Sequence, residues 1–144
     1  MLQQSLKTYQ AGVLQARSYR KLRQFMIAQL KDHELTMMEW SVLGLVYDYT
    51  SSGGASVSQI ADLVDVEMSQ ITTMLNALER QKLLQRIINP LDRRSRKIVT
   101  TKAGDKKVEK VEKELRTAMK LWLEEIPEKQ LSIYIKTLQL IAKK

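Results

Sequence analysis

The stretch from Met68 to Gly104 constrains the fold more than any other part of the chain. It opens with a helical pattern, because apolar residues recur at i, i+3, i+4 and i+7 between Ile71 and Leu78. Two β-rich runs follow at 84–88 and 96–100, and the turn between them contains Asn-Pro and Asp. The pattern predicts a helix followed by a β-hairpin with a longer loop.

Two capping boxes mark the starts of helices ahead of this stretch. Thr36 with Glu39 forms the first and Ser56 with Gln59 the second, since each pair can satisfy the free amides of a first helical turn. The short helix after Ser56 and the helix that begins near Glu67 are separated by about three residues, which is helix-turn-helix spacing. With the hairpin added, residues 36–101 are predicted to form a winged helix-turn-helix.

The flanking segments predict further helices. Residues 5–31 predict one long helix, or two helices with a weak point near Gly12. Residues 102–125 show apolar residues at near-heptad steps, and Pro127 suits the first turn of a last helix. Together they carry more apolar surface than a small winged domain can cover. Residues 1–35 and 102–144 are therefore predicted to form a helical dimerisation region, with a monomeric helical appendage as the alternative.

The predicted fold class is mainly α with a small β-hairpin (α+β), the terminal helices forming a dimerisation domain. The residues expected in the contact with a second copy are Leu6, Tyr9, Val13, Leu131, Ile135, Leu138 and Ile141.

Positive charge is concentrated in one span of the chain. The formal net charge is +8, and the span from Arg86 to Lys102 holds six cations against one acidic residue, Asp92. A concentrated basic patch favours an anionic polymer as partner, whereas a solvated basic turn is the simpler alternative. The outer face of the preceding helix is instead polar and has no early Lys or Arg. A polar helix beside a basic hairpin is suited to reading base edges with one element and holding phosphates with the other.

Several other classes of protein are disfavoured. Cysteine is absent, which excludes disulfides, thiolate metal sites and a cysteine-based redox switch. There is neither a long apolar run nor a secretion signal, so a cytoplasmic location without membrane contact is expected. The single histidine, His33, lies in a polar link with Asp32 and Glu34, where an exposed linker is favoured over a weak metal site. No catalytic residue, metal or cofactor is predicted, and the chain is not expected to be an enzyme.

Four segments carry a resemblance to a known family. They are Leu35-Thr36-(x)3-Trp40-Ser41-Val42-Leu43, Gln59-Ile60-Ala61-Asp62-Leu63, Leu78-Glu79-Arg80-Gln81-Lys82-Leu83-Leu84, and Asp92-Arg93-Arg94-Ser95 through Thr101-Lys102-Ala103-Gly104. In this order they resemble the MarR family of winged helix-turn-helix transcriptional regulators. The most specific part is Asp-x-Arg in the wing, followed by Thr-x-x-Gly after the second strand.

The resemblance implies a homodimer that binds a pseudo-palindromic double-stranded DNA operator, usually as a repressor. The helix from Glu67 to about Lys82 would enter the major groove, Arg94 would enter the minor groove, and Asp92 would orient the wing. The residues implied to face DNA are Ser69, Gln70, Thr72, Thr73, Asn76, Arg93, Arg94, Arg96 and Lys97. A winged helix used for protein contact, without specific DNA binding, is the alternative function.

Three positions depart from the family pattern. Asp65 stands where glycine is common, although Asp tolerates the left-handed conformation better than most residues. Glu67 replaces a Ser or Thr cap, and Thr100 replaces an apolar strand residue.

The resemblance also implies release by a small amphipathic or phenolic ligand, since family members often bind one. The aromatic residues available for such a site are Tyr9, Tyr19, Trp40, Tyr47 and Tyr49, for which an ordinary core role is an equal alternative. The operator sequence, the regulated genes and the ligand's identity are not encoded in any motif.

Overall fold

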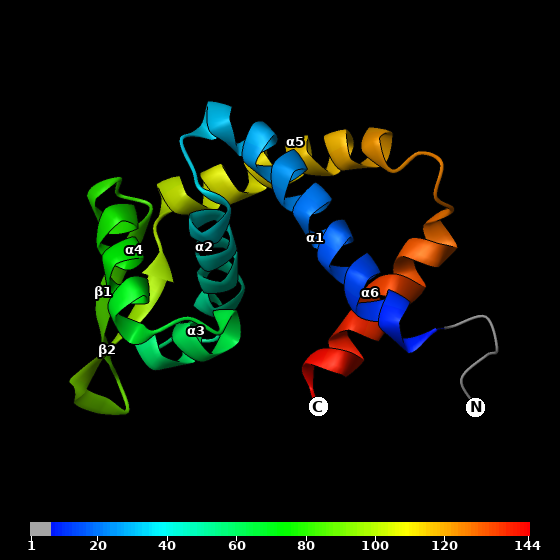
Figure 1. Ribbon diagram of the computed structural model, residues 1–144. Helices are drawn as coiled ribbons and strands as arrows, with labels where there is room; N and C mark the ends of the chain where they lie inside the picture. Colours follow the sequence, from blue (N-terminus) through cyan, green and yellow to red (C-terminus); the bar gives the residue numbers. More distant parts are fainter. Residues whose placement is uncertain (1–6) are drawn as a thin grey trace. The chain divides into compact units, whose positions relative to one another are not determined.

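The computed structural model describes residues 7–144. Its elements, in chain order, are α1 (Thr8–Leu30), the 3-10 turn η1 (Lys31–His33), α2 (Met37–Thr50), α3 (Val57–Val64), α4 (Met68–Arg80), β1 (Leu84–Asn89), β2 (Asp92–Thr100), α5 (Lys102–Trp122) and α6 (Glu128–Ala142) (Figure 1). The chain divides into two compact units, Met1–Glu112 and Lys113–Lys144, and the boundary falls within α5. The predicted mainly helical fold with one small hairpin is confirmed. Within residues 7–144, no helix combines the length and the apolar character needed to cross a membrane.

The core of the first unit is built from helices α2, α3 and α4. Their inward side chains are fully or almost fully buried because each helix repeats its apolar residues at helical spacing. The buried residues of these three helices are Val42, Leu43, Val46, Ile60, Ala61, Ile71, Leu75 and Leu78. Ile98 of β2 and Val111 of α5 are fully buried as well, and the hairpin and the first half of α5 belong to this same unit.

Both predicted capping boxes are present. The Thr36 hydroxyl accepts from the Glu39 amide at 3.1 Å, and the Glu39 carboxylate accepts from the Thr36 amide at 3.3 Å. Ser56 and Gln59 make the same reciprocal pair at 3.2 and 2.9 Å. These bonds satisfy amides that have no partner inside the helix, so the starts of α2 and α3 are determined locally.

The turn between α3 and α4 depends on Asp65. This residue has φ 54° and ψ 50°, the left-handed conformation that the sequence allowed for Asp in place of glycine. Its backbone amide donates to the carbonyls of Ala61 and Asp62, which ends α3 and redirects the chain into α4.

The hairpin differs from its prediction at the tip. Strand β2 begins at Asp92 rather than at Arg96, and Asn89 pairs with Asp92. The register shifts between Ile88 and Asn89, so three residues of β2 form a bulge opposite that step. The prediction of a longer loop was therefore wrong, because the wing arginines lie within the strand and only Pro90 and Leu91 form the turn.

An isolated antiparallel β-bridge between Ala55 and Ile98 connects the hairpin to the segment between α2 and α3. Ala55 and Ile98 exchange backbone hydrogen bonds at 3.0 and 2.7 Å, directly after Gly54. Gly54 has φ +95°, and a Cβ at this position would lie 2.5 Å from the Ile98 carbonyl oxygen. Only glycine fits there without moving the backbone.

The Thr-x-x-Gly motif forms the start of α5. The Thr101 hydroxyl accepts from the Gly104 amide at 3.0 Å and donates to the Lys82 carbonyl at 2.6 Å. A Cβ on Gly104 would collide with the backbone of Leu83. The motif therefore holds the first turn of α5 against the backbone of Lys82 and Leu83, the link between α4 and β1.

Thr100, the polar residue at an expected apolar position, is buried with 6% of its surface exposed. Its hydroxyl lies 2.5 Å from a carboxylate oxygen of Asp105 and 3.1 Å from the Thr50 hydroxyl. Because every partner is a hydrogen-bonding group, the threonine is accommodated in the core without an unsatisfied polar atom.

Candidate nucleic-acid interface

Helix α4 presents a polar face that is largely exposed to solvent within residues 7–144. Ser69, Gln70, Thr73 and Asn76 are exposed, and Thr72 is partly buried. The Thr72 hydroxyl donates to the Met68 carbonyl at 2.9 Å, and the Thr73 hydroxyl donates to the Ser69 carbonyl at 3.1 Å. Since these donors are used within the helix, both hydroxyl oxygens are left as hydrogen-bond acceptors on its surface.

Glu67 begins α4 as its N-cap residue but makes no side-chain capping bond. Its side chain is exposed at the helix N-terminus, where a negative charge is electrostatically favourable. The carboxylate therefore sits at the same end of the helix as Ser69 and Gln70.

The tip of the hairpin is held by side-chain hydrogen bonds. The Asp92 carboxylate accepts from the backbone amide of Arg94 at 3.0 Å, and Oδ1 of the Asn89 side chain accepts from the backbone amide of Leu91 at 3.0 Å. Nδ2 of the Asn89 side chain also donates to the Ser95 hydroxyl at 3.0 Å. Such local bonds stabilise a turn in one conformation. The sequence indicated Asn89 and Asp92 as turn residues, but it did not predict the bond from Asn89 to Ser95 across the tip.

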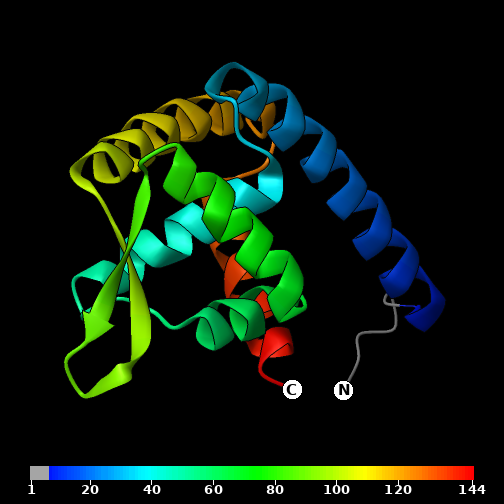
Figure 2. The ribbon, with the colours of Figure 1, turned by 90° about the vertical axis from the view of Figure 1, so that its left-hand side faces the viewer.

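The wing arginines lie in the first half of β2, directly after the turn. Arg93, Arg94 and Arg96 are exposed, and Lys97 is partly buried. A guanidinium nitrogen of Arg96 donates to the carbonyls of Arg93 and Ser95 at 3.2 and 3.3 Å, so this side chain folds back over the bulge. Figure 2 shows the hairpin tip projecting clear of helices α3 and α4 of its own unit. Cationic side chains on a projecting hairpin are suited to contacts with phosphates.

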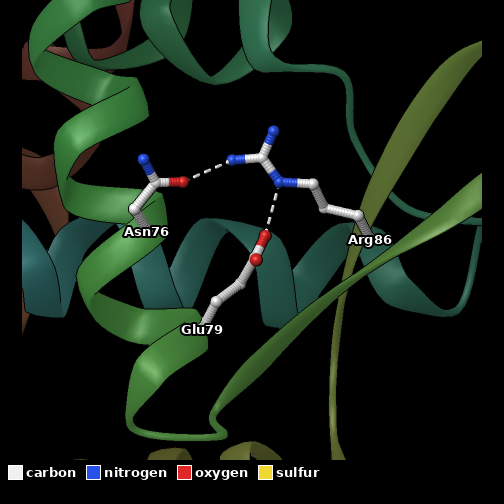
Figure 3. Close-up of polar contacts among 3 residues, drawn as sticks. All are labelled: Asn76, Glu79 and Arg86. Atoms are coloured by element: carbon white, nitrogen blue, oxygen red, sulfur yellow. Dashed lines mark hydrogen bonds and ion pairs between the residues drawn. The ribbon is translucent and has the colours of Figure 1, made fainter.

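Arg86 differs from the other cations of the basic span. Its Nε donates to Glu79 Oε1 at 2.5 Å, and its Nη2 donates to Asn76 Oδ1 at 2.9 Å (Figure 3). The charge of Arg86 is thus paired with a carboxylate of α4, and the guanidinium links β1 to α4. Counting charges along the sequence placed this residue in the basic patch, whereas the fold brings it to the polar helix face.

The predicted dimerisation residues fall on exposed or partly exposed positions. On α1, Tyr9 and Val13 are 69% and 58% exposed, and on α6, Ile135 and Ile141 are 52% and 58% exposed. Leu131 and Leu138 are partly buried, and Leu6 lies outside the described residues. Within the described part of the chain, each of the two helices therefore carries apolar side chains that are exposed to solvent.

The arrangement of α3, α4 and the hairpin defines a winged helix-turn-helix protein. The family model described as MarR family matches residues 35–95, which span α3, α4, β1 and the first part of β2 up to Ser95. Over these residues the chain is similar to the MarR family.

Individual relatives agree with this assignment. The chain is 32% identical over 94 residues to the HTH-type transcriptional regulator MhqR of Bacillus subtilis (strain 168), an alignment that covers 65% of this chain and 61% of MhqR. It therefore spans less than two thirds of that relative's length.

Solved structures extend the similarity over most of the chain. A MarR-family transcriptional regulator from Rhodococcus sp. RHA1 superposes with a TM-score of 0.83 at 23% identity, covering 96% of this chain and 97% of that one. CouR from Rhodococcus jostii RHA1, solved bound to p-coumaroyl-CoA, has a TM-score of 0.78 at 25% identity, with coverage of 92% and 91%.

Proposed function

We propose that this protein is a sequence-specific DNA-binding transcriptional regulator that acts in the cytoplasm as a repressor. The observation that carries the proposal is the exposed polar face of α4 together with a wing that carries three exposed arginines, Arg93, Arg94 and Arg96, all within one compact unit. The similarity of residues 35–95 to the MarR family, and of the chain to an HTH-type transcriptional regulator, supports it. The proposed role is regulatory rather than catalytic.

Each element has a distinct task in this proposal. Helix α4 enters the major groove, where its Ser, Gln, Thr and Asn side chains meet the base edges. Arg94 enters the minor groove, whose negative potential attracts arginine, while Asp92 holds the backbone that carries it. Arg93, Arg96 and Lys97 contact phosphates or the narrow groove. The phosphate contacts set the register, and the side chains of α4 read the sequence.

The protein is proposed to bind its operator as a homodimer. The exposed apolar faces of α1 and of α6 support this part of the proposal, because each would be covered in a symmetric pair. A two-fold symmetric dimer places two α4 helices at a fixed spacing, which matches a pseudo-palindromic site with half-sites about one helical turn apart.

Selection of bound fragments from genomic DNA by the purified protein tests the proposal. We expect enrichment of a pseudo-palindromic sequence, with affinity that falls about a thousandfold or more between 50 and 200 mM salt, as six to ten phosphate contacts require. A winged helix used only for protein contact would enrich no sequence. A flat salt response would also rule out the DNA-binding role.

A small ligand that releases the operator is a second part of the proposal. It is supported by CouR, a relative at 25% identity that was solved with p-coumaroyl-CoA bound. An amphipathic or phenolic compound that binds the free protein better than the DNA-bound form would shift the population away from DNA. Phenolic acids and their thioesters should therefore raise the melting temperature of the free protein and weaken its DNA binding together. Compounds that change neither quantity would argue against ligand control.

A further inference from the structure

Arg86 of β1 is the donor in two hydrogen bonds to α4, one to Asn76 and one to Glu79. In Figure 3, Arg86 reaches from β1 toward Asn76 and Glu79 on α4 and bonds to both, with Nη2 donating to the Asn76 oxygen and Nε to the Glu79 carboxylate. The side chains of Arg86 and Glu79 are 33% and 32% exposed, so the ion pair is partly shielded from water. Glu79 therefore holds the guanidinium in the position from which it reaches Asn76.

The orientation of the Asn76 amide follows from this contact. A guanidinium has five N–H donors and no acceptor, so only the oxygen of an amide can face it. The Asn76 nitrogen makes no hydrogen bond within residues 7–144, and Figure 3 shows it pointing away from Arg86. Asn76 is exposed on the polar face of α4 and has both Nδ2 protons free to donate.

We propose that Arg86 is a positioning residue that makes Asn76 a hydrogen-bond donor toward DNA. This inference rests on the proposed function. Asn bound to adenine uses its oxygen and its nitrogen together, on N6 and N7 of one base. Here the oxygen already accepts from Arg86 and is oriented toward it, so the paired contact would have to share that oxygen with the guanidinium and is disfavoured. The Asn76 nitrogen instead selects an acceptor in the major groove, such as guanine O6 or N7, or thymine O4.

The test measures base preference, because a purely structural role for Arg86 would not change it. After the operator has been selected with wild-type protein, each base pair of one half-site is replaced in turn and binding is measured for four variants. Asn76→Asp keeps an oxygen toward Arg86 and removes both donors. Arg86→Met removes the guanidinium, Arg86→Lys keeps the charge without the fork, and Arg23→Met is a control at an exposed arginine of α1.

We expect Asn76→Asp to lose discrimination at one base pair per half-site by about tenfold, the size of one good base contact. Arg86→Met and Arg86→Lys should lose preference at that same base pair, while Arg23→Met keeps the wild-type profile. Arg86→Lys keeps the test decisive even if the methionine variant is too unstable to measure.

Three results would overturn the inference and leave the proposed function intact. They are an unchanged profile in Asn76→Asp, a wild-type profile in both Arg86 variants, and a uniform loss of affinity in the Arg86 variants at every operator position. If the wild-type protein selects no operator at all, the proposed function itself fails.

Discussion

Removing Arg94 should weaken DNA binding without weakening the fold. The Arg94 side chain is exposed, and the bond that holds its backbone, from its amide to Asp92, does not involve the guanidinium. Replacing it with alanine should therefore change the free energy of unfolding by less than about 0.5 kcal/mol, as for other surface substitutions.

The effect on DNA binding can be estimated from counterion release. A homodimer carries two copies of Arg94, and each cation that neutralises a phosphate contributes about 0.9 to the slope of log affinity against log salt. Losing both copies should reduce the slope by about 1.8. At 0.15 M salt this corresponds to roughly thirtyfold weaker binding, before any loss of minor-groove contacts is added.

Fluorescence anisotropy with a labelled operator, at four salt concentrations between 50 and 300 mM, measures both quantities. Arg23→Ala is the matched control, because it removes one exposed cation from α1 and should leave the slope unchanged. An Arg94→Ala protein with the slope and affinity of the wild type would show that the wing does not contact DNA through this residue.

Three further substitutions test the assembly, the packing and the pH response. Ile135→Lys on α6 should shift the protein from dimer to monomer in sedimentation velocity at unchanged helicity, because Ile135 is 52% exposed in the single chain and available to a second copy. A variant that stays dimeric would show that this face of α6 is not part of the dimer interface. Gly104→Ala should lower the free energy of unfolding by about 1–3 kcal/mol in urea titration, because its Cβ collides with the Leu83 backbone. A stability equal to wild type would mean that this contact relaxes freely. The negative charge of Glu109 raises the pKa of Tyr47 above its usual value of 10.0, and the Glu109 carboxylate also accepts a hydrogen bond from the Tyr47 hydroxyl at 3.3 Å. The folded state therefore holds that proton more tightly than the unfolded chain, and the resulting stability is present below pH 10 and lost as the pH rises further. Tyr47→Phe should show a shallower fall of melting temperature above pH 10 than wild type, and identical profiles would contradict this linkage.

Features that depend on neighbours in the chain were predictable. The capping boxes at Thr36 and Ser56 and the left-handed Asp65 follow from interactions over three or four residues, and the structure shows each of them. The buried face of α4 was predictable for a similar reason, because helical periodicity alone places Ile71, Leu75 and Leu78 on one side.

The tip of the hairpin was predicted less well. The Asn-Pro and Asp signals located the turn, but the bulge that carries Arg93 and Arg94 into β2 depends on the pairing of two strands. Strand register is set by the packing of one face and by cross-strand pairs, which no short window of sequence contains.

The sequence by itself determined the order of elements, the helix starts and the excess of positive charge, because these follow from local patterns and composition. Tertiary structure decided which charges are available to a partner. Arg86 was counted among the cations of the basic patch, yet the hairpin returns it to α4, seven residues beyond Glu79 and ten beyond Asn76. An electrostatic or hydrogen-bonding role depends on distance in space, and folding sets that distance independently of separation along the chain.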